Sequence, residues 1–396
     1  MIKVNWLSVQ LLLVTFLAGC SEPQKSEQLV IENVNGYTFD NDRQQQRFQT
    51  LVIEEGKVIA SGGPELARNY SQAEKVDGQG KTLLPGMTDA HGHVSSLGFS
   101  LLRIDLRGLE SAQNTAQVVA QYAARKPALS WIQGRGWNQV LWAGKQFPSA
   151  SILDVEIDDR PVWLERIDGH AGWANSAAMK LAGITKHTLA PAGGEIIHDA
   201  AGEPTGILID NAMALVVDVI PQPNDDEIAL ALDTVTKHFL SLGITSTHDA
   251  GVSPAEHALY RKTADKGRMQ VRIYGMISST NADLDQTFAQ GPTIDEQDFY
   301  TVRSVKIYTD GALGSRGAAM LKPYTDRPDH SGLLLTTAEQ LRSLFSRAIK
   351  ADFQVAIHAI GDRGNRIALD EVEHAYATVG GRHLRHRIEH SQVVTL

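Results

Sequence analysis

The sequence predicts an α/β protein whose main domain is a (β/α) barrel, and three observations predict it. Short apolar runs rich in β-branched residues recur after residue 80, and helix-like segments separate them. Strands that alternate with helices in this way favour a parallel sheet. No glycine-rich phosphate-binding loop follows any of the runs, which favours a barrel over a flat, doubly wound sheet.

The elements of this barrel can be placed in order along the chain. The first strand is predicted directly after the breaker pair Pro85-Gly86, and five more apolar runs predict five more strands. Three helix-like segments lie between them, and Thr336 or Thr337 can cap the last one. The strands are expected near residues 87–93, 243–251, 271–278, 302–311, 353–362 and 384–392, with helices over 225–242, 254–267 and 337–352.

Two regions flank or interrupt the barrel, which is predicted to occupy residues 81–396. Residues 29–80 have the pattern of short strands and turns, including a hairpin over 51–59. They are too few to hold a core alone, so we expect them to form part of a composite, small β-sandwich domain. Residues 100–240 are rich in tryptophan and include a hairpin pattern over 193–212. We expect this large insertion after the first barrel strand to form a lid over the catalytic mouth.

The composition is that of an ordinary soluble globular protein. Hydrophobic residues make up 42% of the 396 residues and charged residues 21%. The net charge of -9 argues against a nucleic-acid partner or an anionic membrane surface, because both require basic protein surface. A small-molecule substrate is the expected partner.

The first 28 residues predict export and lipid anchoring. Residues 1–20 combine Lys3, an apolar stretch and Leu17-Ala18-Gly19-Cys20, which resembles a bacterial lipobox, and residues 21–28 have a linker composition. We predict a lipoprotein attached to the membrane only through lipid on Cys20 and facing the periplasm; an ordinary secretory signal is the alternative. Cys20 is the single cysteine, so structural disulfides and a zinc–thiolate site are excluded.

Histidines at the ends of the predicted strands are the first candidates for chemistry. His91 and His93 are two residues apart on one strand, so both side chains face the same way and can reach one cation. Such a pair alone is weak evidence of a metal site, but Asp89 lies nearby and Gly92 leaves room for a ligand. His248, His358 and His390 lie at the ends of three other runs, where the catalytic residues of a barrel belong.

Lys306 is the second kind of candidate. It lies within an apolar strand, so its ammonium must be buried, which is costly without a partner. One interpretation is an ion pair with Asp310 or another carboxylate. The other is a neutral lysine that reacts with carbon dioxide to give a carbamate, an anionic ligand that can bridge two metals.

Four motifs, in this order, resemble the amidohydrolase superfamily, and more narrowly amidohydrolase family 3, the group that includes YtcJ-like proteins and N-substituted formamide deformylase. They are KTLLPGMTDAHGH (81–93), VKIYTDGALGSRGA (305–318), QVAIHAIGD (354–362) and RIEHSQ (387–392). The resemblance extends from Leu29 to Leu396 and includes GRGW (134–137), DGHAGWANS (168–176) and THDAG (247–251).

The resemblance implies a metal-dependent hydrolase with a TIM-type (β/α)8 barrel and one or two divalent metal ions, with zinc as the default. It implies that His91 and His93 bind the more buried metal, that Lys306 is a carboxylated bridge, and that His358 and His390 bind the second metal. It also implies a metal-activated water as the nucleophile. The positions of Arg135, His170 and Arg316 resemble family positions near the substrate, with lid packing and ion pairing as the alternative role. The role of His248 stays open.

The sequence departs from the family pattern in one respect. The family places a metal-binding, proton-shuttling aspartate on the eighth strand, and no such segment follows the sixth predicted strand here. About six of the eight strands are therefore expected, and we expect a C-terminally truncated form of a longer protein.

Three functions follow from these patterns. The leading one is hydrolysis of a non-peptide carbon–nitrogen bond in a small amide or formamide. The second is a non-catalytic, lipid-anchored binding protein, and the third is ester, lactone or deaminase chemistry at the same metal centre.

Overall fold

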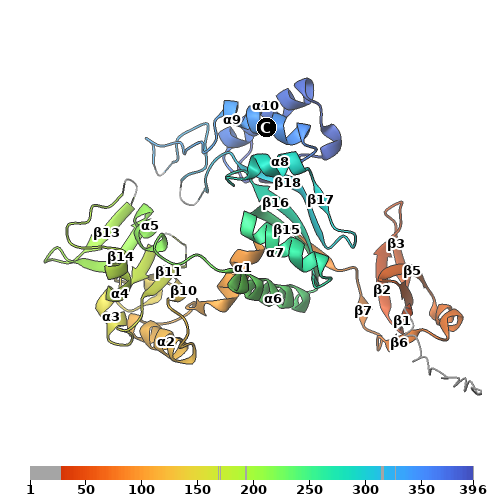
Figure 1. The fold of residues 1–396 in the computed structure, drawn as a ribbon, viewed down its shortest axis with the longest axis horizontal. Helices are drawn as coiled ribbons and strands as arrows, with labels where there is room; N and C mark the ends of the chain where they lie inside the picture. Colours follow the sequence, from red (N-terminus) through yellow and green to blue (C-terminus); the bar gives the residue numbers. More distant parts are fainter. Residues whose placement is uncertain are drawn as a thin grey trace, which may run out of the picture. The chain divides into compact units, whose positions relative to one another are not determined.

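The computed structural model describes residues 28–167, 169, 171–191, 194–313, 316–325 and 327–395, apart from the side chain of Asp210 (Figure 1). The chain divides into two compact units, Met1–Pro85 and Gly86–Leu396. The predicted leader with Cys20, and residues 21–27 of the predicted linker, lie outside the described residues. Among the residues that are described, no helix is both long and apolar enough to span a membrane.

The first unit consists of two small sheets with the strand orders β5-β4-β1-β6 and β3-β2-β7. The expected hairpin joins β4 to β5, and Glu55 and Gly56 at its turn have left-handed φ angles of 50° and 76°, as a two-residue hairpin turn requires. A small core contains Val30 and Val52. The strands are β1 (Gln28–Glu32), β2 (Asn35–Phe39), β3 (Gln45–Phe48), β4 (Thr50–Glu54), β5 (Lys57–Gly62), β6 (Glu74–Asp77) and β7 (Thr82–Leu83).

The second unit is built on a curved parallel sheet, which confirms the predicted barrel class. Six strands follow each other in the order β8-β15-β16-β18-β19-β20, all parallel, and β17 (Thr293–Ile294) pairs antiparallel with β18. Each of the six predicted barrel strands is present. They are β8 (Met87–Gly92), β15 (Ile244–Val252), β16 (Arg272–Ser278), β18 (Tyr300–Tyr308), β19 (Gln354–Ala359) and β20 (Arg387–His390).

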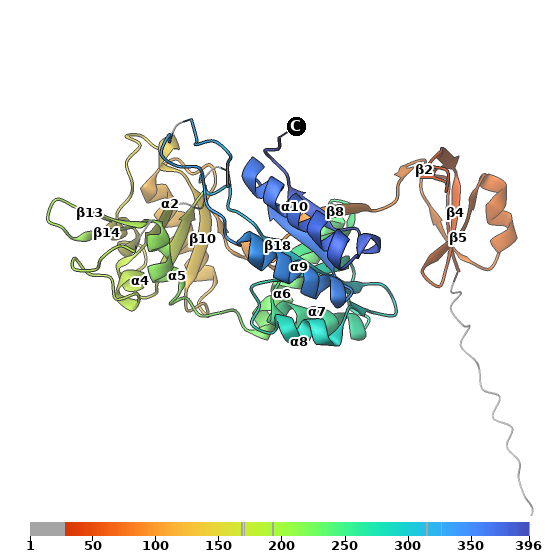
Figure 2. The same cartoon turned by 90° about the horizontal axis from the view of Figure 1, so that it is seen from above.

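Helices connect these strands and cover one face of the sheet (Figures 1 and 2). The caps follow the sequence signals, because Asn224 with Glu227, Ser253 with Glu256 and Thr337 with Gln340 each form a reciprocal capping box. The helices of this layer are α1 (Val94–Leu102), α6 (Asp225–Ser241), α7 (Pro254–Asp265), α8 (Leu284–Gln290), α9 (Ala338–Lys350) and α10 (Asp362–Thr378).

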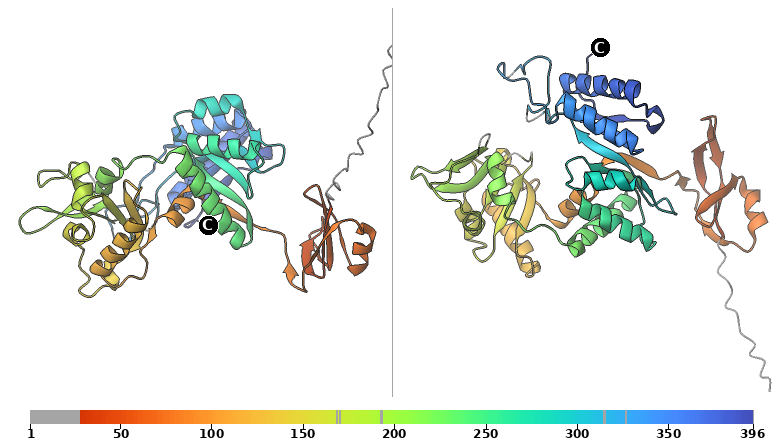
Figure 3. Two further views of the ribbon diagram at one scale, coloured as in Figure 1. Left: turned by 60° about the horizontal axis from the view of Figure 1, so that its bottom comes forward. Right: turned by 45° about the horizontal axis from the view of Figure 1, so that its top comes forward.

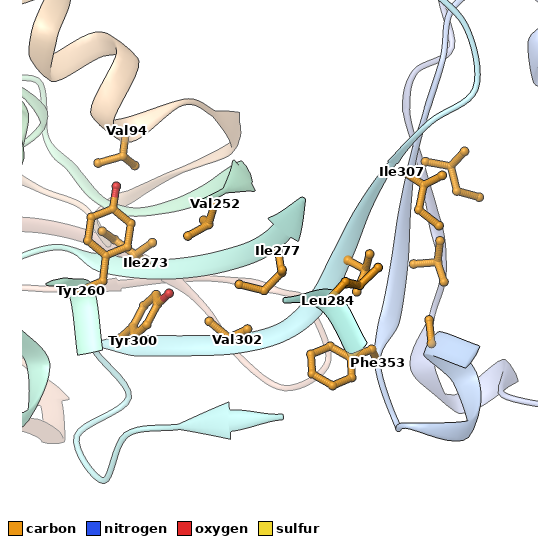
Figure 4. Close-up of a cluster of buried hydrophobic side chains, with 14 of the residues drawn as sticks. Val94, Val252, Tyr260, Ile273, Ile277, Leu284, Tyr300, Val302, Ile307 and Phe353 are labelled. Carbon is orange, nitrogen blue, oxygen red and sulfur yellow. The ribbon is translucent and has the colours of Figure 1, made fainter. Parts of the chain in front are cut away.

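The main core lies between this sheet and its helices (Figure 4). Side chains from alternate strand positions, such as Ile273, Ile277 and Val302, meet apolar helix residues there. Tyr260 of α7 packs edge-on against Tyr300 of β18, with ring centroids 5.6 Å apart. Burial of these large side chains fixes which face of each strand points away from the helices, because strand residues alternate between the two faces.

The insertion between β8 and β15 forms its own mixed sheet, ordered β13-β14-β12-β11-β10-β9, with short helices on it (Figure 3). Trp137, Trp142 and Trp173 pack together in one of its two cores. The hairpin pattern over 193–212 corresponds to the antiparallel pair β13–β14. The elements are β9 (Ile104–Asp105), α2 (Ala112–Arg125), β10 (Ile132–Trp137), α3 (Ala150–Asp154), β11 (Val162–Arg166), β12 (Ala171–Ala174), α4 (Ser176–Leu181), β13 (Gly194–His198), β14 (Pro204–Asp210) and α5 (Ala214–Val217).

Helix α6 lies within the predicted lid range of 100–240 but packs with the barrel helices. A Cβ at Gly98 of α1 would lie 2.4 Å from the carbonyl oxygen of Ala231 in α6, so only glycine allows the two helices to approach this closely. The elements that form the insertion therefore run from β9 to α5.

Candidate metal centre

Strand alternation places Lys306 and His358 on the inner face of the curved sheet, away from the helices. On β18, Val305 and Ile307 belong to the core under the helices, so Lys306 between them points the other way. On β19, Ile357 belongs to the same core, and His358 follows it. Tyr308 pairs with His358 in the register of the two strands. Lys306 and His358 therefore lie on the inner face, because the apolar residues next to them in sequence pack against the helices on the outer face.

His91 near the end of β8 is oriented by a buried carboxylate on β20. Its Nδ1–H donates to Glu389 Oε2 at 2.5 Å, and Glu389 is only 3% exposed. The other ring nitrogen, Nε2, is buried and has no hydrogen-bond partner among the described residues. A histidine that donates one N–H to a carboxylate and leaves the other nitrogen unpaired has the arrangement of a metal ligand.

His390 reaches the same place through an unusual backbone conformation. Glu389 precedes it on β20, and adjacent strand residues normally point to opposite faces. His390 has φ 73° and Ser391 has φ 46°, both in the left-handed region that non-glycine residues rarely adopt. This turn ends the strand and allows both Glu389 and His390 to approach His91. Such local strain often accompanies a functional site.

Four of the predicted ligands have neighbouring imidazole rings. The ring centroids are 5.5 Å apart for His91 and His93, 4.6 Å for His91 and His390, and 4.5 Å for His358 and His390. His93 stands immediately after β8, as the residue that begins helix α1. Residues from three strands, separated by up to about 300 positions in the sequence, are therefore brought to one end of the sheet.

The surroundings favour the neutral form of His93, His358 and His390, because burial lowers the pKa of each. Burial lowers the pKa of His358, and nearby Lys306 and His91 add to the effect. The pKa of His390 is also lowered, by its partial burial and by His358 and His91. A neutral imidazole has the free lone pair that a metal ion requires.

Lys306 is 1% exposed and forms no ion pair with any described carboxylate. The alternative that it pairs with Asp310 is therefore wrong, since that carboxylate is occupied by backbone N–H groups. Burial lowers the pKa of Lys306, and Arg387 lowers it further, whereas Glu389 opposes the shift. A lysine held closer to neutrality is a better nucleophile.

Arg387 links the first and last strands of the sheet. It donates to the carbonyl oxygen of Ala90 on β8 at 2.7 Å, to Glu389 at 3.0 Å, and to Nδ1 of His248 on β15 at 2.7 Å. These contacts curl β20 towards β8 and give a nearly closed barrel. One of them involves His248, whose Nδ1 accepts a hydrogen bond from Arg387.

Asp249 fixes the start of helix α1 behind His93. Its Oδ1 accepts from the N–H of Val94 at 3.1 Å, and its Oδ2 accepts from the hydroxyl of Tyr260 at 3.1 Å. The hydroxyl of Ser95 lies 2.9 Å from that of Tyr260. This buried network holds the residue after His93 and therefore limits how the His93 side chain can move.

We predict that Asp249 makes the fold less stable as the pH rises. Burial raises the pKa of Asp249 from 3.8 to about 7; Glu256 adds to the increase, and hydrogen bonds from Val94 and Tyr260 oppose it. Because the folded pKa is the higher one, stability is greatest below about pH 4 and falls as the pH rises to about 7, at about 1.4 kcal/mol per unit.

The measurement is urea unfolding of wild type and Asp249→Asn at pH 5 and pH 8. The asparagine cannot ionise, so the wild type should lose about 2–3 kcal/mol relative to the variant between these values. Equal pH dependence of the two proteins would contradict the prediction.

Asp310 connects the end of β18 to two loops at the same edge of the sheet. The residue is 0% exposed, and its carboxylate accepts from the backbone N–H groups of Ile360, Gly361 and Ala319 at 2.8–2.9 Å. Its Oδ1 lies 3.6 Å from Nε2 of His358. Asp310 thus positions both the loop that follows β18 and the residues that follow His358.

The residues at this site fit a divalent metal ion in their chemistry. The set offers neutral imidazoles, one of them with an orphaned buried nitrogen, and a lysine that burial makes reactive. Within the described part of the chain, no three His, Cys, Asp or Glu side chains are already arranged around a common point for a cation. The donor types are therefore present, and the side chains must adjust to hold an ion.

The structure describes two of the three residues that were predicted near the substrate. Arg135 lies on β10 of the insertion and is exposed, and its side chain makes no hydrogen bond or ion pair with the described residues. Arg316 lies in the loop after β18 with a left-handed φ of 59°, and its carbonyl oxygen accepts from Nε2 of His330 at 2.9 Å. His170 lies outside the described residues.

Glu389 and Arg387 are the functional candidates that sequence reasoning missed. A signal was present for both, because RIEH places two opposite charges in a strand that must be partly buried. Asp310 was considered only as a partner for Lys306, and its role as an acceptor for three backbone N–H groups was not predicted.

Comparison with known proteins identifies relatives of this chain. A family model described as "Amidohydrolase family" matches residues 74–396. The chain is 30% identical to YtcJ of Bacillus subtilis over 91% of this chain and 68% of that protein. It is 28% identical to N-substituted formamide deformylase of Arthrobacter pascens over 87% of this chain and 65% of that protein. The chain is also 34% identical to the protein LONG AFTER FAR-RED 3 of Arabidopsis thaliana, and it spans 63% of the length of that protein.

Solved structures show the same fold. A metal-dependent hydrolase of uncharacterised function from Pyrococcus horikoshii has a TM-score of 0.75 at 28% identity, covering 93% of this chain and 71% of that one. The family model and the shared fold define a protein of the metal-dependent hydrolase class. This chain belongs to the amidohydrolase family.

Proposed function

We propose that the protein hydrolyses a carbon–nitrogen bond, other than a peptide bond, in a small amide or formamide-like substrate. The observation that carries the proposal is the pairing of His91 with the buried Glu389, which leaves a buried ring nitrogen without a partner beside two further imidazoles. A non-catalytic fold has no reason to keep such a costly group. The similarity to N-substituted formamide deformylase supports the substrate class.

His91, His93, Lys306, His358 and His390 are the residues that would hold one or two divalent ions, with zinc as the expected ion. When bound, such an ion lowers the pKa of a water molecule and polarises the substrate carbonyl. The chain's own residues prepare this chemistry. Glu389 orients His91 through Nδ1, and the carbonyl oxygen of Gly311 accepts a long hydrogen bond from Nε2 of His358 at 3.4 Å. Each partner fixes which ring nitrogen keeps its lone pair.

The test is to measure metal content and amide hydrolysis together. Purified protein should carry one or two metal ions per chain, and His91→Ala should reduce that content by at least half. His187→Ala, which changes an exposed histidine of the insertion, is the matched control and should keep it. Activity against a panel of N-alkylformamides, small cyclic amides and esters then defines the bond that is cleaved. Undiminished hydrolysis by metal-free protein would exclude the proposal.

We also propose that the protein is exported and anchored to the membrane through lipid on Cys20, on the strength of the lipobox pattern in residues 17–20. In a bacterial host, wild-type protein should incorporate labelled palmitate and sediment with membranes. Cys20→Ala should incorporate none. Equal labelling of the two proteins would show that Cys20 is not the lipidation site.

A further inference from the structure

A cavity of about 460 Å³ lies away from the histidine cluster. It is bordered by the C-terminal end of α1, by β10 and β11 of the insertion, and by the segment 217–230 that leads into α6. None of its lining residues is a candidate metal ligand or one of the residues that orient them. Its volume lies within the range of about 300–1,000 Å³ typical of small-molecule sites.

The walls of this cavity are largely apolar and aromatic. Trp131 and Trp163 contribute indole rings from the insertion, and Leu102, Ile220 and Leu230 contribute aliphatic side chains from α1 and from the 217–230 segment. Both tryptophans are buried. Aromatic walls with a few polar groups among them are the usual composition of a ligand site.

Three polar side-chain groups on the wall lack a hydrogen-bond or ion-pair partner among the described residues. The indole Nε1–H of Trp163 is buried without an acceptor, although the side chain is only 1% exposed. Arg103 and Glu165 both line the cavity, and neither side chain makes a hydrogen bond or an ion pair with the described residues, although the Arg103 guanidinium lies 6.0 Å from the ring centroid of Phe99. Burial lowers the pKa of Arg103, and the charges of Glu165 and Tyr122 partly offset this.

The other charged or hydroxyl groups on the wall are already used or solvated. Tyr122 donates to the carbonyl oxygen of Leu102 at 2.8 Å, and Glu227 accepts from the backbone N–H of Asn224 in the capping box of α6. Lys126 is exposed. Among the described residues that line it, the cavity therefore presents the Arg103 guanidinium and the Glu165 carboxylate without ion-pair partners and the indole N–H of Trp163 without an acceptor; the amides of Gln133 and Gln222 also line it.

We propose that this cavity binds a small zwitterion with an apolar body, such as an aromatic amino acid. The ligand carboxylate would pair with Arg103 and accept from Trp163 Nε1, and its ammonium would pair with Glu165. Its apolar side chain would lie among the tryptophan and aliphatic walls. A ligand with only one charge would leave either Arg103 or Glu165 without an ion-pair partner, which is why the zwitterion is favoured.

The test is calorimetric titration of the full chain with L-phenylalanine, with tryptophan fluorescence as a second readout. We expect 3-phenylpropanoate, which lacks the ammonium, and 2-phenylethylamine, which lacks the carboxylate, to bind at least tenfold more weakly. Glycine, which lacks the apolar body, should also bind at least tenfold more weakly. Arg103→Met and Glu165→Gln should each weaken L-phenylalanine binding about tenfold, as expected for the loss of a charged hydrogen bond.

Two controls separate this site from others. Arg107→Met changes an exposed arginine that pairs with Asp105 outside the cavity and should bind L-phenylalanine like wild type. His91→Ala should also bind it like wild type, because the histidine cluster is not part of the cavity. Trp163→Phe replaces the indole with a smaller aromatic ring that has no N–H, and should weaken binding; because the substitution also leaves a space in the core, its thermal unfolding temperature is measured alongside. Absence of binding, equal binding of 3-phenylpropanoate, or loss of binding in His91→Ala would overturn the proposal.

Discussion

Lys306→Met is expected to make the metal-free protein more stable and the enzyme inactive. Methionine matches the length of the lysine stem but carries no charge, so it removes an ammonium that is 1% exposed and unpaired with any described carboxylate. Replacing a buried charged group with an apolar one of similar volume often stabilises a protein by about 1–4 kcal/mol. Loss of a group that supports the reacting centre should lower kcat/KM about 10³-fold.

The two effects must be measured in different states of the protein. Urea unfolding is performed after chelation, because bound metal would stabilise the folded wild type by mass action and hide the gain. Hydrolysis is measured after metal is restored. Lys237→Met is the matched control, since Lys237 is exposed and pairs with exposed Asp233, and it should change neither quantity much.

This pair of results distinguishes a catalytic lysine from a structural one. A lysine that held the fold together would lower stability when it is removed, and its loss of activity would follow from unfolding. If Lys306→Met keeps full activity, Lys306 is not part of the reacting centre. If metal-free Lys306→Met is less stable than metal-free wild type, the buried ammonium does not lower the stability of the fold.

The barrel could be predicted because its signals are local. The apolar runs that became β15, β16, β18 and β19 differ from the predicted ranges by only a few residues. The cap at Thr337 was one of two residues that the sequence offered. Apolar periodicity and capping depend on residues close together in the chain, so they are visible in a single sequence.

The orientation of the candidate ligands could not be predicted in the same way. The contact between His91 and Glu389 joins residues 298 positions apart, and the left-handed φ of His390 has no counterpart in residue type. Strict alternation would place Glu389 and His390 on opposite faces of β20. The structure brings both to His91 because the backbone turns at that point, and only tertiary contacts specify such a turn.

The separate roles of the polar residues could not be predicted for the same reason. His248 could be identified as a strand-end histidine but not as the acceptor for Arg387. Asp310 could be considered as a partner for Lys306 but not as an acceptor for three backbone N–H groups. The sequence predicts which residues come to the inner face; hydrogen-bond geometry decides which of them orient others and which stay free to react.

Asp310→Ala should destabilise the barrel unit strongly, by about 4 kcal/mol. The substitution leaves three buried backbone N–H groups, on Ile360, Gly361 and Ala319, without their acceptor. Each unsatisfied buried donor costs about 1–3 kcal/mol. A water molecule could recover part of this cost in the space that the carboxylate leaves, so the expected total lies below the sum of three full penalties.

The measurement is the free energy of unfolding in urea, with Asp233→Ala as the control. Asp233 is an exposed carboxylate in a surface ion pair on α6, so its removal should cost no more than about 0.5 kcal/mol. Asp310→Asn is a second variant for this comparison. In asparagine an NH₂ group takes the position of one acceptor oxygen, so it must face at least one backbone N–H that it cannot accept from. We therefore expect Asp310→Asn to be destabilised as well, although it nearly matches the shape of aspartate. If Asp310→Asn were as stable as wild type, the three N–H contacts would not be the reason for burying this carboxylate.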